Sequence, residues 1–152
     1  MAVHGQRCLG GFGLSFGKQT SPTHTLVANV NELHSLAAFG DPAEFLTYVR
    51  QSAKAGTNPR RFTVRAEKID LDPRFGPFSA VTYSEVEDRA AANARGNASL
   101  VLKVYGYVFV HAHFPNLVIS IDYSERGRRD ELDPAFEARA KQFIEGIRLK
   151  QP

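Results

Sequence analysis

The sequence predicts an α+β domain, with two main helices and an antiparallel sheet of about five to six strands in the order β-β-α-β-β-β-β-α. Several segments alternate apolar and polar residues, which is the period of a half-buried strand. Two other segments carry apolar residues at helical spacing behind a capping signal. Short turn-forming stretches join neighbouring strands, which favours antiparallel pairing. Because there is no internal repeat, linker or low-complexity tract, residues 1–152 are expected to form a single domain.

The first two strands are expected to form a hairpin. Residues 12–16 alternate Phe and Leu with Gly and Ser, and a turn follows at Ser21 and Pro22. In the next strand, residues 23–30, alternation places one set of side chains on one face: His24, Leu26, Ala28 and Val30. Residues 1–11 are expected to be a flexible N-terminal segment.

The first helix is predicted to begin at Asp41. Asp41 can cap the helix, Pro42 has the φ angle of a first helical residue, and Glu44 can reach back to the cap amide. The apolar stripe that follows has helical spacing: Phe45, Leu46, Val49 and Ala53. Gly56 and Pro59 are expected to end the run.

Two further strands are predicted after this helix. Residues 62–71 alternate, but Ile69 and Leu71 are out of phase with Phe62, which predicts a β-bulge. A turn-rich loop at residues 72–77 leads to a strand at residues 79–88. Residues 90–98 are expected to be a mobile connection.

The last pair of strands and the final helix complete the predicted order. A long strand at residues 99–114 turns at Pro115 and Asn116 and returns as residues 117–124. The return strand is expected to face inward through Leu117, Ile119, Ile121 and Tyr123. Asp133 is the predicted cap of the second helix, with Pro134 in its first turn. The apolar stripe of that helix is Phe136, Ala140, Phe143, Ile144 and Ile147.

Composition excludes several classes of protein. Hydrophobic residues make up 43% of the chain and charged residues 23%, which argues against disorder. The net charge is only +3, from 19 Lys and Arg against 16 Asp and Glu, and the basic residues form no convincing groove, so nucleic acid is not an expected partner. No stretch reaches the roughly 18 consecutive apolar residues of a transmembrane segment.

Cys8 is the only cysteine, so the chain has no intramolecular disulfide. The first residues lack the apolar core of a secretory signal, which favours the cytoplasm if this N-terminus is taken literally. If the start is truncated, Cys8 could instead be the lipid-anchored first residue of a protein of the periplasm or cell envelope.

The order of elements and three stretches carry a resemblance to a known group of proteins. The stretches are THTLVANV at residues 23–30, DPAEFLTYVR at residues 41–50 and ISIDYSERG at residues 119–127. Over residues 12–149 the chain resembles small uncharacterised bacterial envelope lipoproteins, and it is similar in outline to the PsbP/Mog1-type α+β sandwich. The resemblance implies an envelope location and carries no site residue, because it contains no chemical motif.

One motif could suggest an enzyme. Residues 13–17 match the G-x-S-x-G pattern of serine hydrolases, but Ser15 lies within an alternating strand instead of at a strand-to-helix turn. We therefore predict a non-enzymatic binding or structural domain.

The stretch at residues 105–114 is the main candidate for a binding surface. Strand alternation places five side chains on one face: Tyr105, Tyr107, Phe109, His111 and His113. The opposite face, with Val104, Val108 and Val110, is predicted to belong to the core. Contiguous aromatic surface favours docking of a protein or a small ligand on the Tyr105–His113 face. The alternative is that a helix covers this face.

His111 and His113 also support an alternative function, that of a metal-dependent enzyme or metal-binding protein. Their Cα atoms would lie about 6.6 Å apart on one face of a strand, so both imidazoles could bind one zinc or iron ion. A two-residue turn at Pro115 and Asn116 would place Asp122 opposite Phe109 and diagonally across from His111, as a possible carboxylate ligand.

Overall fold

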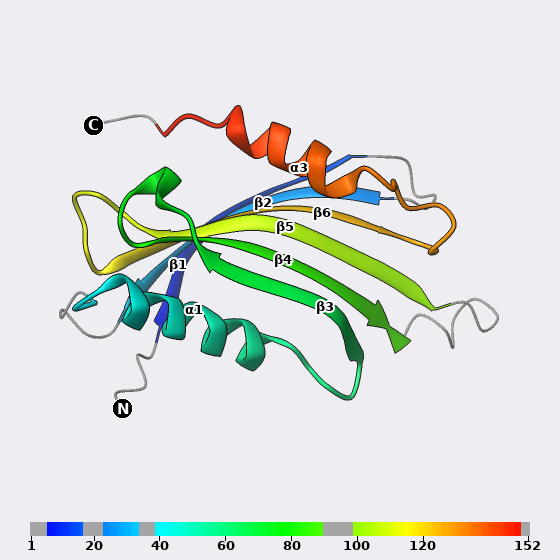
Figure 1. The fold of residues 1–152 in the computed structure, drawn as a ribbon, viewed down its shortest axis with the longest axis horizontal. Coiled ribbons are helices and arrows are strands. Elements are labelled where there is room, and N and C mark those ends of the chain that lie inside the picture. The colour runs from blue at the N-terminus through cyan, green and yellow to red at the C-terminus, as the bar shows by residue number, and fades with distance from the viewer. Residues whose placement is uncertain (1–5, 17–22, 34–38, 90–98, 150–152) are drawn as a thin grey trace.

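The protein is a six-stranded antiparallel sheet with one long helix on each face (Figure 1). A computed structural model describes residues 6–16, 23–33, 39–89 and 99–149. The strands are β1 (Gln6–Phe16), β2 (Thr23–Leu33), β3 (Phe62–Leu71), β4 (Ser79–Asp88), β5 (Leu100–Val110) and β6 (Leu117–Gly127). The helices are α1 (Pro42–Gly56), a 3₁₀ turn η1 (Pro73–Phe75) and α3 (Phe136–Glu145). The predicted α+β class and element order are confirmed.

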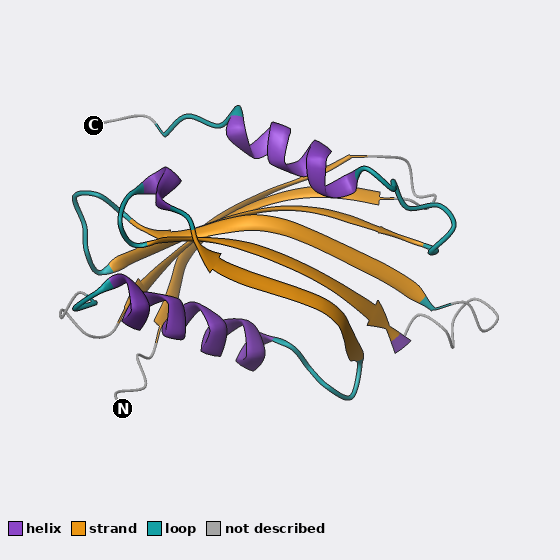
Figure 2. Cartoon of the chain, in the orientation of Figure 1, coloured by secondary structure: helices purple, strands orange, loops and turns teal. Residues whose placement is uncertain are grey.

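The strands lie in the order β1-β2-β6-β5-β4-β3, so the hairpin β1-β2 joins the sheet through β6. Helices α1 and α3 pack on opposite faces, which makes three layers (Figure 2). Here the two faces are named the α1 face and the α3 face. Because strand side chains alternate, residues with even numbers in β4, β5 and β6 point to the α1 face.

Helix α1 begins as predicted. The Asp41 side chain accepts a hydrogen bond from the Glu44 amide at 2.8 Å, and Pro42 occupies the first turn. The Glu44 carboxylate reaches back, but to the amide of Gly40, at 2.7 Å, instead of to the amide of Asp41. Phe45 and Val49 are buried against the sheet, and the helix ends at Gly56.

Strands β3 and β4 also follow the prediction. Their register shifts between Val64 and Ala66, which is the expected irregularity. The shift brings Ile69 onto the α1 face, where it is buried against α1. The predicted boundaries of β4 agree with the structure, and residues 90–98, predicted as a mobile connection, lie outside the described residues.

Several predicted boundaries differ from those of the structure. Residues 6–11, expected to be flexible, form the first half of β1 and pair with β2 from Gln6 to Leu33. Strand β5 ends at Val110, not at residue 114, and β6 extends to Gly127. Helix α3 begins at Phe136, and its cap position is Ala135; the Asp133 carboxylate accepts from the Ala135 amide at 2.9 Å in the preceding turn.

Within the described part of the chain, no helix has the length and apolar character needed to cross a membrane.

Candidate functional site

The α3 face holds the main aromatic core of the protein. Tyr105, Tyr107 and Phe109 of β5 are 5%, 3% and 1% exposed. Phe109 stacks on Phe75 with ring centroids 4.4 Å apart, and all three residues belong to the core cluster that includes α3. The predicted docking face therefore does not exist at these three positions, because α3 and η1 cover them. The alternative, a helix-covered face, describes the structure.

The two tyrosine hydroxyls do not need solvent to be satisfied. The Tyr107 hydroxyl donates to Asp72 Oδ2 at 2.9 Å, and the Tyr105 side chain hydrogen-bonds to Tyr107, with the two rings edge-on and their centroids 6.2 Å apart. Burial is the main cause that raises the pKa of the Tyr107 hydroxyl, so it stays a neutral donor. A buried tyrosine with a partner for its hydroxyl is an ordinary core residue.

His111 and His113 lie beyond the end of β5, in the connection to β6. Their ring centroids are 6.0 Å apart, and the His113 amide donates to His111 Nδ1 at 3.1 Å. The connection is longer than the predicted two-residue turn: the His111 amide donates to the Leu117 carbonyl at 2.9 Å, and Val110 pairs with Val118.

This longer connection separates Asp122 from the two histidines. Phe109 pairs with Ile119, whereas Asp122 pairs with Gly106 and points to the α1 face. Over the described ranges of the chain, no group of three His, Cys, Asp or Glu side chains could hold a metal ion. The proposed set of His111, His113 and Asp122 was wrong, because a shift of register by three residues moves Asp122 along the sheet and onto its other face.

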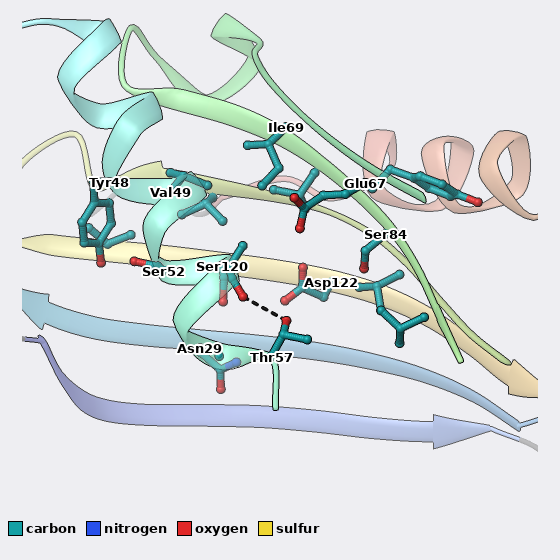
Figure 3. A pocket seen from close by; sticks show the side chains of 18 of the residues that line it. Asn29, Tyr48, Val49, Ser52, Thr57, Glu67, Ile69, Ser84, Ser120 and Asp122 are labelled. Carbon is teal, nitrogen blue, oxygen red and sulfur yellow. Dashed lines mark hydrogen bonds between the residues drawn. The ribbon is translucent and has the colours of Figure 1, made fainter. Parts of the chain in front are cut away.

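The α1 face is different, because a hollow of about 660 Å³ lies between α1 and the sheet (Figure 3). Apolar side chains from α1 and β5, such as Val49, Val104 and Val108, form part of its wall. Polar side chains from the helix and four strands also line it, among them Ser52 of α1, Asn29 of β2, Glu67 of β3, Thr82 and Ser84 of β4, and Ser120 and Asp122 of β6. The face that was predicted to be core therefore holds both a core cluster, against which Val108 and Val110 pack, and a pocket.

Asp122 is the most unusual group in this pocket. Its carboxylate makes no hydrogen bond or ion pair with any described residue, and it points into the space beneath α1 (Figure 3). Burial raises the pKa of Asp122 from 3.8 to about 6. Asp122 is half-buried, and at neutral pH its carboxylate is ionised where the surrounding protein limits its hydration.

The two fully buried acids among the described residues have partners. Asp88, 2% exposed, accepts from Arg61 at 2.8 Å and from Arg126 at 2.9 Å. Glu125, 1% exposed, accepts from the Asp133 amide at 3.1 Å. The folded protein therefore provides partners for two fully buried carboxylates and, among described residues, none for Asp122.

Gly106 makes room for the Asp122 carboxylate. These two residues are opposite each other in β5 and β6, and a Cβ atom on Gly106 would collide with Asp122 Oδ1 and with the Ile121 carbonyl oxygen. The missing side chain of Gly106 thus lets the Asp122 carboxylate lie close to the backbone of β5, while Val104 and Val108, the next residues of β5 on this face, line the pocket.

Gly106→Ala is expected to lower the free energy of unfolding by about 2 kcal/mol, because the added methyl group overpacks a buried site. Urea denaturation measures the change. Adding Asp122→Ala should recover only part of the loss, since the Ile121 carbonyl remains in contact. Full recovery in the double variant would show that only the Asp122 side chain restricts this position.

Two further features of the pocket carry negative or partial negative charge: the C-terminus of α1 and the Glu67 carboxylate. The last turn of α1 lies over the pocket through Ser52, Ala53 and Thr57, and the Thr57 hydroxyl donates to the Ala53 carbonyl at 3.0 Å (Figure 3). A helix C-terminus carries a partial negative charge. Glu67 of β3 adds a second carboxylate, and the described lining contains no Lys, Arg or His.

Sequence reasoning missed this pocket, although two signals for it were present. Ser120 and Asp122 alternate with Ile119, Ile121 and Tyr123, which resembles the solvent face of a strand. Gly106 interrupts a run of large residues in a central strand, and such a glycine marks a place where something approaches the backbone closely. Neither signal shows that α1 covers this face.

No protein-family model and no curated protein matches the chain. Cys8 is exposed and pairs with Asn31 of β2. The resemblance to envelope lipoproteins, the location in the periplasm or envelope and lipid attachment at Cys8 stay predictions.

Proposed function

We propose that this protein is a non-enzymatic binding domain that takes a small molecule into the pocket between α1 and the sheet. The observation that carries the proposal is the ionisable Asp122 side chain, which lies on the pocket floor without a partner among the described residues. This proposal replaces the Tyr105–His113 face as the binding surface, since its three aromatic residues are core.

The size and lining of the pocket support this function. Pockets for small molecules typically measure about 300–1,000 Å³ and combine apolar walls with a few polar groups that fix orientation. The hollow beneath α1 has about 660 Å³, valine side chains along part of its wall and hydroxyl, amide and carboxylate groups along the rest.

The contrast between the two faces supports it as well. On the α3 face, side chains from strands and helix fill the space with stacked and edge-on aromatic rings. On the α1 face, a core cluster around Phe45 is joined by a hollow that Ser120 and Asp122 line, and burial raises the pKa of Asp122. A desolvated, unpaired carboxylate destabilises the folded state. A ligand that hydrogen-bonds to Asp122 would relieve this penalty, which gives the residue a role in binding.

A pocket-filling substitution tests the proposal. We expect a library of small fragments, screened by amide chemical shifts, to give hits whose shifts cluster on β4, β5 and β6 around the pocket. Ser120→Leu should abolish these shifts, because the larger side chain occupies space that Ser120 leaves open between Asn29 and Val108.

Ser124→Leu is the matched control, because Ser124 lies on the same face of β6 but does not line the pocket. It should retain the fragment shifts. If no fragment shifts the pocket residues of the unsubstituted protein, or if Ser120→Leu leaves the shifts unchanged, the pocket is not a binding site.

A further inference from the structure

We infer that the ligand of this pocket presents an organic cation, such as a protonated amine, to the carboxylate of Asp122. The inference rests on the proposed function and specifies the chemical class of the ligand. Three features of the pocket support it: the charges of its lining, the C-terminus of α1, and the valine and serine side chains of its wall.

The formal charges of the pocket have one sign. Asp122 on the floor and Glu67 on β3 are the ionisable carboxylates among its described lining, and that lining contributes no basic side chain. Figure 3 shows both carboxylates on the side of the sheet that α1 covers. An anionic ligand would bring like charges together, most strongly beside the half-buried Asp122, whereas a cation would be attracted.

The position of α1 acts in the same direction. Its C-terminal turn, not its N-terminal turn, lies over the pocket, through Ala53, Gly56 and Thr57. The partial negative charge of a helix C-terminus stabilises a nearby cation and disfavours an anion. The helix C-terminus and the Asp122 carboxylate thus lie on two sides of the same space, and Lys54, the basic residue of this turn, is not part of the pocket lining.

The wall and the hydroxyl groups define the rest of the ligand. Val104, Val108 and Val118 offer apolar contact from β5 and β6, which suits a carbon skeleton and not a bare metal ion. Ser84 and Ser120 carry hydroxyls that accept hydrogen bonds from the remaining N–H groups of an ammonium ion. An ammonium ion paired with Asp122 replaces the hydration that the carboxylate loses on burial.

Three matched probes test the inference: benzylamine, benzyl alcohol and benzoate, which share a ring and differ in charge. At pH 7.5 we expect benzylamine to shift the amides around Asp122 with at least tenfold higher affinity than benzyl alcohol, and benzoate to give no saturable shift. Asp122→Asn should remove the advantage of benzylamine. Asp130→Asn, at an exposed position of the loop after β6, should preserve it.

The pH dependence adds a second readout. The affinity for benzylamine should fall as pH is lowered through about 6, where Asp122 takes up a proton, and Asp122→Asn should abolish this dependence.

The outcomes separate this inference from the proposed function. If benzylamine and benzyl alcohol bound in the pocket with equal affinity, the inferred preference for a cation would be wrong, but the pocket would still be a binding site. Tight binding of benzoate at the pocket would do the same. Absence of pocket shifts with all three probes, together with failure of the fragment screen, would overturn both.

Discussion

Phe109→Ala is expected to lower the free energy of unfolding by about 3–5 kcal/mol, the range for a fully buried phenylalanine. Phe109 is 1% exposed and stacks on Phe75, so truncation removes aromatic contacts and leaves a cavity between β5 and η1. The surrounding strands cannot collapse into the space, because each is fixed in the sheet by its ladder of hydrogen bonds. Urea denaturation followed by circular dichroism gives the value.

Phe114→Ala provides the comparison within the same stretch of sequence. Phe114 is 54% exposed in the connection between β5 and β6, so its truncation should change stability by no more than about 0.5 kcal/mol. The pair of variants separates a core from a docking surface. If both variants were equally stable, the assignment of Phe109 to the core would be wrong, and the aromatic face would again be a candidate for partner binding.

Asp122→Asn is expected to raise the free energy of unfolding at pH 7.5 by about 1–3 kcal/mol. The pKa of Asp122 is 3.8 in its reference state and about 6 in the folded protein, and each unit corresponds to about 1.4 kcal/mol. The folded state therefore holds the Asp122 proton more tightly than the unfolded state does. Ionisation above pH 6 destabilises the native protein, and the neutral amide of asparagine avoids this penalty.

The sign of this effect can be followed with pH. Below pH 4 the carboxyl group is protonated in both states, so the variant should have little advantage. The stability advantage of Asp122→Asn over the wild type should grow between pH 4 and pH 6 and stay constant above pH 6. In this range the unfolded wild-type chain has already lost the Asp122 proton while the folded protein still holds it, so wild-type stability falls as pH rises. Urea denaturation of both proteins at pH 4, 5, 6 and 7.5 measures the difference, with Asp130→Asn as the exposed control.

If the stability difference between Asp122→Asn and the wild type did not change with pH, the raised pKa assigned to Asp122 would be wrong. A loss of stability in Asp122→Asn at pH 7.5 would mean that the carboxylate has a stabilising partner in the free protein. Either result would remove the reason to assign this residue to a ligand.

Local sequence patterns predicted most of the elements. The cap formed by Asp41 and Pro42 placed the start of α1, because capping depends on neighbours within one turn. The phase change between Phe62 and Ile69 predicted the bulge in β3, because alternation is a property of a single strand. The start of α3 was less accurate: Asp133 forms a turn before the helix, and no side chain caps Ala135.

The site could not be predicted in the same way. The residues facing each other across β5 and β6 depend on the length of the connection between them, and the predicted two-residue turn gave the wrong partner for Asp122. A change of pairing alters which side chains meet, so the metal hypothesis failed although both histidines and the aspartate are present.

The sequence by itself determined the two sets of side chains on β5 and the polar positions of β6, because alternation assigns each residue to one of two faces. Only the tertiary structure decided that α3 and η1 cover Tyr105, Tyr107 and Phe109, and that α1 encloses Asp122. Burial is a property of what packs on a face, and helices that are distant in sequence supply it. The same rule that placed Tyr107 and Asp122 on opposite faces therefore left open which helix would cover each face and where a pocket would remain.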